Sequence, residues 1–232
     1  MHDGTRQEPL FDALAAGYDG WFATPLGAHA FAVEREALLA LTPEVAGEKA
    51  LDAGCGTGVF THVLAEAGAD VTGIDISPAM LRRAQARGLP VAQAGAHALP
   101  FAAGSLDLIW SVTMLEFVAD PAGAVAEMAR VLRPGGRLVA GTINGSSRWA
   151  EYYRRQQGTV FQQAHFLTPA ELVGLLKRYG RVTWHTVLFV PPSYGGRRPG
   201  MAWLLEWLGR RLLPGRGGFL ATAVQLNETS IL

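Results

Sequence analysis

The sequence has little cysteine, no excess of charge and no long apolar run. Its single cysteine, Cys55, excludes an internal disulfide and favours a reducing compartment. Twenty basic and twenty acidic residues give a formal net charge of zero, so no global attraction to nucleic acid or to an anionic membrane exists. The first ten residues lack the apolar core of a signal peptide, and no run approaches a membrane span. We therefore expect a cytoplasmic protein with no transmembrane segment and no nucleic-acid partner.

The apolar content and its pattern predict the fold class. Apolar residues make up 49% of the 232 residues, enough to bury a sizeable core. Short apolar runs alternate with stretches of helical period, which predicts an α/β fold with a mostly parallel sheet and helices on both faces. The expected strands lie at 49–53, 70–74, 91–94, 106–111, 137–142, 182–190 and 219–226. The expected helices between them lie at 59–67, 78–87, 122–132, 147–157 and 169–179.

The organisation along the chain indicates one domain, residues 1–232, with three parts. Residues 1–45 have apolar positions at helical spacing, broken near Thr24–Pro25, and are expected to form an N-terminal helical lid. Residues 46–144 are expected to form the cofactor-binding core, and residues 145–232 cap helices and a C-terminal strand pair. Because the last two strands follow each other without a long crossover, we expect them to pair antiparallel at one edge of the sheet.

A glycine-rich turn is the first candidate site. The segment "LDAGCGTGVF" places Gly54, Gly56 and Gly58 between an expected strand and an expected helix. Such a turn leaves backbone N–H groups at a helix N-terminus, where they can hold an anionic or polar group. Asp75 ends the next strand, seventeen residues after Gly58, where a carboxylate can accept hydrogen bonds from both ribose hydroxyls. The spacing predicts a nucleotide site, and by itself it fits NAD as well.

Two details separate this loop from a pyrophosphate site. The loop lacks the later glycine that brings helix and strand together around a pyrophosphate. Asp52, directly before the loop, would repel a pyrophosphate but suits a cationic ammonium or sulfonium group. The residues therefore favour a cofactor that carries a positive charge.

Further motifs follow in order: "GIDIS" at 73–77, "ALPF" at 98–101, "LDLIWS" at 106–111 and "RVLRPGGRLV" at 130–139. Together with the glycine loop they resemble the class I S-adenosylmethionine (SAM) dependent methyltransferases, in the type 11 branch that acts on small molecules. The likeness covers about residues 51–143, and "YDGWFATPLG" at 18–27 resembles a lid segment of the same branch. The resemblance implies a Rossmann-like, seven-stranded, mostly parallel sheet with an antiparallel last strand. It also implies SAM as cofactor and S-adenosylhomocysteine as product.

The resemblance implies a role for each motif position around SAM. The glycine loop would lie under the methionine part, with Asp52 near its amino group, and Asp75 would hold the ribose. Ile76 and Met80 would pack against the adenine. The complete implied cofactor set is Tyr18, Asp52, Gly54, Cys55, Gly56, Gly58, Asp75, Ile76, Met80, Ala96, His97, Ser111, Val112 and Thr113.

The sequence departs from the family at the adenine. The family often has an acid in the turn before "ALPF", and this chain has Gly95 there, with His97 where a glutamate is common. Adenine would then be recognised by backbone groups or by His97. Pro134–Gly136 is expected to form a turn before the fifth strand.

The substrate side is less defined by the sequence. A neutral imidazole titrates near working pH, so His165 is a candidate general base, the alternative being a histidine on the surface or in the cap. Glu116 would either orient the methionine amine or cap a turn. No His, Asp or Glu cluster has metal-ligand spacing, so no metal is expected. The expected substrate-binding residues are Trp21, Met114, Phe117, Asn144, Trp149 and Tyr153.

These observations predict a SAM-dependent methyltransferase that modifies an oxygen, nitrogen or sulfur atom of a small, apolar or aromatic metabolite. Two alternatives stay open at this point, an NAD-dependent oxidoreductase and a non-catalytic SAM-binding module. No Tyr-x-x-x-Lys pair, a common reductase arrangement, is present in the sequence. A monomer or a homodimer is expected.

A strongly apolar helix is predicted near the end, at 201–213, "MAWLLEWLGRRLL". It carries one acid, Glu206, and is too short to span a membrane. Three roles are open: packing on the sheet edge, lining a substrate pocket or dimer face, or lying on a membrane surface. The arginines in and around it are Arg197, Arg198, Arg210, Arg211 and Arg216.

Overall fold

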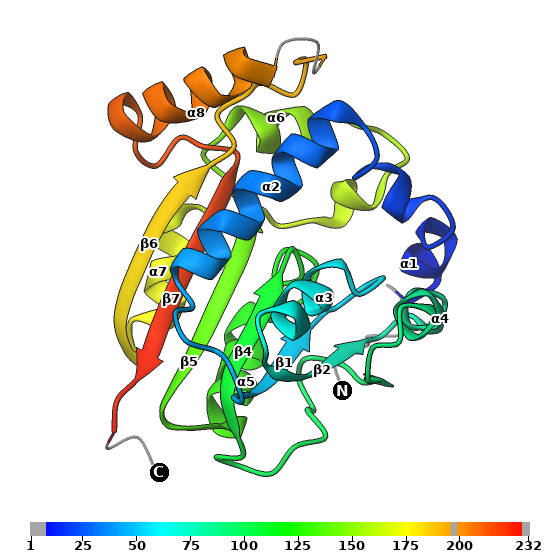
Figure 1. Cartoon of the computed structure of the whole chain (residues 1–232), viewed down its shortest axis with the longest axis vertical. Helices are drawn as coiled ribbons and strands as arrows, with labels where there is room; N and C mark the ends of the chain where they lie inside the picture. The colour runs from blue at the N-terminus through cyan, green and yellow to red at the C-terminus, as the bar shows by residue number, and fades with distance from the viewer. Residues whose placement is uncertain (1–7, 196–198, 229–232) are drawn as a thin grey trace.

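The computed structural model describes residues 8–195 and 199–228. Arg197 and Arg198 thus lie outside the described residues. One seven-stranded sheet runs through the molecule (Figure 1). Its strands are β1 (Lys49–Ala53), β2 (Asp70–Asp75), β3 (Val91–Gln93), β4 (Leu106–Val112), β5 (Leu132–Ile143), β6 (Gly180–Val187) and β7 (Phe219–Leu226). The helices are α1 (Glu8–Leu14), η2 (Tyr18–Gly20), α2 (Pro25–Ala40), α3 (Val59–Glu66), α4 (Pro78–Ala86), α5 (Pro121–Val131), α6 (Arg148–Arg154), η3 (Val160–Gln163), α7 (Pro169–Leu176) and α8 (Pro199–Leu212).

The strand order is β3-β2-β1-β4-β5-β7-β6. Strands β1 to β5 pair in parallel, and β7 lies antiparallel between β5 and β6. The expected α/β fold with a mostly parallel sheet and an antiparallel last strand is therefore confirmed. Helices α2 and α3 cover one face and α5 and α7 the other, each over its own apolar cluster (Figure 1). The two clusters arise because parallel strands in the middle of a sheet are apolar on both faces.

Two strands, β5 and β6, differ from the expected bounds by more than one residue. β5 begins at Leu132, and the expected turn at Pro134–Gly136 lies inside it. The register with β4 shifts there, from Leu106 opposite Leu132 to Leu108 opposite Arg137, because proline has no N–H to donate. β6 ends at Val187 rather than at Val190, since Leu188 has a φ of 67°, which an extended strand cannot contain.

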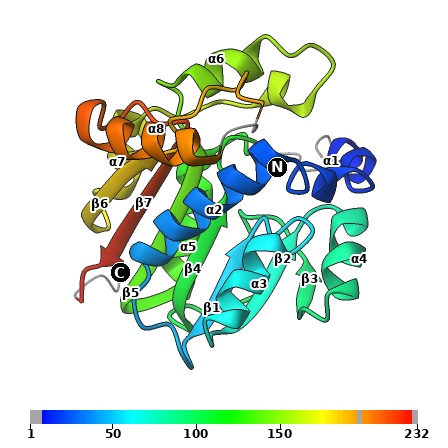
Figure 2. The same ribbon diagram turned by 45° about the horizontal axis from the view of Figure 1, so that its top comes forward.

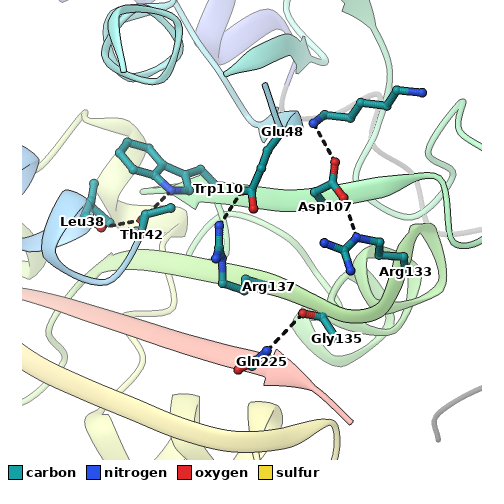
Figure 3. A network of polar contacts seen from close by, with 10 residues as sticks. Leu38, Thr42, Glu48, Asp107, Trp110, Arg133, Gly135, Arg137 and Gln225 are labelled. Atoms are coloured by element: carbon teal, nitrogen blue, oxygen red, sulfur yellow. Dashed lines mark hydrogen bonds and ion pairs between the residues drawn. The ribbon is translucent and has the colours of Figure 1, made fainter. Parts of the chain in front are cut away.

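Polar contacts near the start of β1 and of β4 tie neighbouring strands together (Figure 3). Asp107 at the start of β4 accepts hydrogen bonds from the backbone N–H of Lys49 and from Arg133. Such contacts fix the strands relative to one another where no ligand has to enter. The remaining pairs drawn there are Glu48 with Arg137, Trp110 with Thr42, Thr42 with the Leu38 carbonyl, and Gln225 with the Gly135 carbonyl.

Helix α8 is attached to the sheet by its one acid. Glu206 is 2% exposed, and its carboxylate accepts hydrogen bonds from the backbone N–H groups of Leu188 at 3.0 Å and of Phe189 at 2.6 Å. These N–H groups lack strand partners because the chain leaves β6 at that point. Glu206 therefore replaces the missing backbone acceptors, and packing on the sheet edge accounts for the inner face of α8. No described helix is long and apolar enough to cross a bilayer.

We predict that Glu206→Ala lowers the free energy of unfolding by about 2–3 kcal/mol, because the buried N–H groups of Leu188 and Phe189 lose their charged acceptor. Urea unfolding followed by far-UV circular dichroism measures the loss. The matched control is Glu36→Ala, which removes an exposed acid 3.3 Å from Arg210 and is expected to change the stability by less than about 0.5 kcal/mol. Equal stability of the two variants would contradict this role of Glu206.

Candidate functional site

Two adjoining hollows lie at the carboxyl ends of β1, β2 and β4. The larger is a cavity of about 140 Å³ and the smaller one measures about 10 Å³. They share Tyr18, Gly54, Val112 and Thr113 as lining residues. β1 lies between β2 and β4, so the chain leaves β1 where the direction of strand addition reverses. Ligands of open α/β sheets bind in the crevice at this reversal.

The glycines let the main chain turn closely under the hollows. Gly54, Gly56 and Gly58 have φ values of 79°, 53° and 84°, in the left-handed region that favours glycine. A Cβ atom at Gly54 would collide with the Met114 side chain, and one at Gly58 with Leu89. A Cβ atom at Gly56 would meet no atom within 4 Å. Packing thus requires glycine at two positions, and the third faces open space.

The N–H groups of this loop serve the turn itself. Gly54 and Cys55 both donate to the Ile74 carbonyl at 2.8 Å, and Gly56 donates to Asp75 at 2.9 Å. The end of β2 thus accepts from these three N–H groups, so these three do not point outward to a ligand. The expectation that the helix N-terminus holds an anionic or polar group stays a prediction. What the loop offers is a main chain with little side-chain bulk.

Asp75 joins the loop to the next helix. Its second oxygen accepts a hydrogen bond from the Ser77 N–H at 2.8 Å, and Ser77 in turn caps α4 through the Met80 N–H. Burial raises the pKa of the Asp75 carboxyl, while the N–H groups of Ser77 and Gly56 oppose that shift. Asp75 lines the larger cavity together with Ile76 and Met80. A carboxylate beside two apolar side chains suits a sugar joined to a flat base.

Asp52 lies under the smaller hollow. It is 1% exposed, and one carboxylate oxygen accepts a hydrogen bond from the Thr61 hydroxyl at 2.6 Å. Burial raises the pKa of the Asp52 carboxyl to about 7, although the bond from Thr61 lowers it. A buried carboxyl with no basic partner is stabilised as an anion when a cation binds next to it. The position therefore suits an ammonium group.

The N-terminal segment closes over the larger cavity. Phe11 and Tyr18 line it, and the Phe11 ring lies edge-to-face with Phe117 at 5.2 Å between centroids. The segment is tied down by Asp19, which accepts hydrogen bonds from the Thr57 hydroxyl at 2.6 Å and from Arg87 at 2.7 Å. A ligand in the cavity would thus be covered by residues from the start of the chain.

Most of the residues implied for the cofactor come together here. The larger cavity is lined by Tyr18, Gly54, Gly56, Asp75, Ile76, Met80, Ala96, His97, Val112 and Thr113. Asp52 and Cys55 line the smaller hollow, and burial raises the pKa of the Cys55 thiol. Gly58 and Ser111 line neither hollow; Gly58 is the N-cap of α3, and Ser111 is fully buried in β4. The His97 ring contacts the Asp120 carbonyl at 2.9 Å, so that ring nitrogen is a donor.

Of the expected substrate residues, Met114 and Phe117 line the larger cavity, and Trp21, Asn144, Trp149 and Tyr153 line neither hollow. Asn144 is fully buried, and its amide donates to the carbonyls of Gly215 and Gly217. The Trp149 ring N–H donates to the Val190 carbonyl at 2.8 Å. Asn144 and Trp149 therefore hold the chain around β7, and the expectation that they bind substrate disagrees with this geometry.

Trp21 and Tyr153 belong to a cluster of rings around Trp149. The centroid distances from Trp149 are 6.3 Å to Trp21 and 5.8 Å to Tyr153. Tyr153 also stacks on Phe161 at 4.0 Å. These rings pack mainly on one another, and their role as a substrate cage stays a prediction.

His165 is not brought to the cavity. Its side chain is 67% exposed and lies 4.0 Å from Glu171, the residue that completes the capping box of α7. The segment before α7 turns the imidazole to the surface, since the backbone N–H of His165 donates inward to the Glu116 carbonyl. The structure therefore favours the surface histidine over the general base.

Sequence reasoning missed two features of this region. Phe11 appears in the sequence only as one of several apolar positions of a helix, with nothing to show that it reaches a cavity. Glu34 lies within α2, and burial together with nearby Glu116 raises its carboxyl pKa to about 8. The sequence gives no signal for Glu34, which is one of two acids of α2 and stands in its charged stretch, residues 34–36. The Glu116 carboxylate accepts a hydrogen bond from the N–H of Ile143, the last residue of β5, at 2.7 Å.

Comparison with known proteins gives consistent results. The family described as "Methyltransferase domain" matches residues 51–140. A ubiquinone biosynthesis O-methyltransferase of Xylella fastidiosa is 35% identical over 196 residues, 75% of this chain and 78% of the relative. One of Methylococcus capsulatus is 41% identical over 144 residues, 55% of this chain, and the match spans only 60% of that relative. A SAM-dependent methyltransferase structure from Thermotoga maritima has a TM-score of 0.77 at 24% identity and covers 94% of this chain and 99% of its own.

We predict a pH dependence of ligand affinity from Asp52. Its carboxyl is protonated below about pH 7 in the free protein, and that proton must leave before an ammonium group can pair with it. The affinity for S-adenosylhomocysteine should therefore fall roughly tenfold from about pH 8 to about pH 6. Calorimetric titration measures it. Asp52→Asn should bind more weakly and with no slope, whereas an Asn variant that keeps the slope would contradict the assignment.

Proposed function

The chain belongs to the class I SAM-dependent methyltransferases of the type 11 branch, and from that premise we propose that it methylates a small, apolar or aromatic metabolite. The accepting atom is an oxygen, nitrogen or sulfur. The single observation that carries the proposal is the convergence of Asp75, the glycine turn and the buried Asp52 on two adjoining hollows. Family membership and this geometry together speak against an NAD-dependent oxidoreductase.

The cofactor would be held by three kinds of group. Asp75 would accept hydrogen bonds from the ribose hydroxyls, and Ile76 and Met80 would pack on the adenine. Gly54 and Gly56 would admit the methionine part, whose amino group would lie by Asp52. SAM, when bound, supplies an electrophilic methyl group on a sulfonium. The residues fit it because the hollows offer carboxylates, apolar walls and no described basic side chain among their lining except His97.

The protein's part in the reaction is alignment and exclusion of water. Methyl transfer is an in-line displacement that depends on holding donor and acceptor at the right distance and angle. Phe11 and Tyr18 would cover the donor, and Thr113, in a strained left-handed conformation at φ 48°, lines both hollows. Burial raises the pKa of the Tyr18 hydroxyl to about 12, so it stays a hydrogen-bond donor at neutral pH.

The acceptor class rests on the apolar part of the cavity wall. Met114, Phe117 and Val118 follow β4 and, with Phe11, leave few polar partners for a charged substrate. The names of the Methylococcus and Xylella relatives describe O-methyltransferases, which favours oxygen among the three atoms. We propose that the protein works on such a metabolite as a monomer or homodimer in the cytoplasm.

The experiment that tests this function has two readouts. S-adenosylhomocysteine should raise the melting temperature of the purified protein and NADH should not. Labelled SAM should then pass its methyl group to at least one member of a panel of phenols, amines and thiols. Binding without transfer to any acceptor, nucleic acids and proteins included, would favour a non-catalytic SAM-binding module. Methylation of a macromolecule alone would contradict the substrate class.

We predict that Asp75→Ala lowers the affinity for S-adenosylhomocysteine by about 1–3 kcal/mol, roughly five- to hundredfold, because the ribose hydroxyls lose their acceptor. Calorimetry at constant pH measures the loss. Asp70→Ala is the matched control, since it removes an exposed aspartate from the other end of the same strand. An Asp75→Ala affinity within twofold of the wild type would refute the ribose assignment.

A further inference from the structure

Exposed apolar side chains are concentrated on α8 and on Leu213, the residue that follows it. Of the ten large apolar side chains that are exposed in the described part of the chain, six lie there. Trp207 is 59% exposed and Leu212 67%. The six are Met201, Trp203, Leu204, Trp207, Leu212 and Leu213. Soluble surfaces rarely collect such groups on one element without a partner.

The outward direction of these side chains is fixed by the inner face of the helix. Ala202 and Glu206, one turn apart, are buried at 1% and 2% exposure. A Cβ atom at Gly209 would collide with the Phe189 ring, so the helix approaches the chain after β6 as closely as its backbone allows. Rotation of α8 to bury its tryptophans would break the bonds from Glu206 to Leu188 and Phe189. The apolar face is therefore held outward rather than left unpacked by chance.

The exposed charged groups that α8 itself carries on this side are positive, and an acid of α2, Glu36, lies beside one of them. Arg210 and Arg211 occupy the last turn of α8, and Arg216 follows it. Arg210 lies 3.3 Å from Glu36, and no ion pair among the described residues includes Arg211 or Arg216. The only acid of α8, Glu206, is buried on the opposite side. The exposed side of α8 thus combines tryptophan and leucine with arginine and carries no acid of its own.

The position of α8 relates this face to the site. β6 runs parallel to β5, so its carboxyl end lies at the same end of the sheet as those of β4 and β5. β7 starts at that end, and α8 lies in the connection between β6 and β7. Figures 1 and 2 both show α8 beyond the carboxyl end of β6, at the same end of the molecule as α6.

We propose that the exposed side of α8 binds the surface of an anionic lipid membrane. Tryptophan is suited to the boundary between head groups and acyl chains, and arginine to anionic head groups. The helix is of interfacial length and amphipathic, and it crosses no bilayer. Arginines around an apolar face match an anionic bilayer better than a second copy of the same face, where they would meet like charge. Binding would place the methyl-transfer site near apolar metabolites dissolved in lipid.

The test is co-sedimentation of the full chain with vesicles. Wild-type protein should bind vesicles of phosphatidylcholine mixed with phosphatidylglycerol and bind phosphatidylcholine alone more weakly. Trp203→Ala/Trp207→Ala should reduce the binding at least about tenfold, through the loss of buried apolar area. Arg210→Gln/Arg211→Gln should reduce it roughly fivefold per arginine and only on the anionic vesicles.

A matched pair of leucines serves as the control. Leu212→Ala on α8 should weaken vesicle binding, whereas Leu14→Ala, which removes an exposed leucine from α1, should leave it unchanged. Unchanged circular dichroism and melting temperature show that each variant is folded, without reference to methyl transfer. The proposal is overturned if the wild-type protein sediments with neither kind of vesicle, or if the double tryptophan variant binds as well as the wild type. A concentration-dependent dimer that only this variant abolishes would assign the face to a second copy.

Discussion

The geometry of the site depends on the contact between the glycine turn and the end of β2. Asp75 accepts from the Gly56 and Ser77 N–H groups, and the Ile74 carbonyl accepts from Gly54 and Cys55. These bonds join β1, β2 and α4 at one point, and the left-handed φ values of the glycines make the close approach sterically allowed. The main chain is thereby fixed before a ligand arrives, so little conformational entropy is lost on binding.

The carboxyl groups of Asp52, Glu34 and Glu116 all have raised pKa values, of about 7, 8 and 7, and burial is the first cause in each. A carboxyl whose pKa is raised on folding contributes least to stability once the pH exceeds the folded value, so these groups weaken the fold near and above neutral pH. Of the three, Asp52 lines the smaller hollow, where a bound cation would offset the cost of its desolvation.

The two ends of the strands are built differently. Toward their amino ends, the ion pairs Asp107–Arg133 and Glu48–Arg137 connect neighbouring strands. At their carboxyl ends, the strands are followed by Thr113, the glycine turn and Leu188, whose φ values are positive. The proposed cofactor site lies at the carboxyl ends, because parallel strands bring these ends together. Helix α8 lies at the same end of the strands, since it connects β6 to β7.

The sequence by itself determined the order of the elements, both ends of β1 and β7, the glycine turn, and Asp75 as an acid at the end of β2. These are local properties, set by apolar period, turn residues and spacing, and the family motifs added the cofactor. Sequence could not decide what Asn144, Trp149 and His165 do, since each depends on partners remote in the chain: Gly217, Val190 and Glu116. It also could not choose the outward face of α8, which Glu206 fixes by accepting from Leu188 and Phe189. Only the tertiary structure decides such questions, because direction and burial of a side chain depend on which distant segments pack against it.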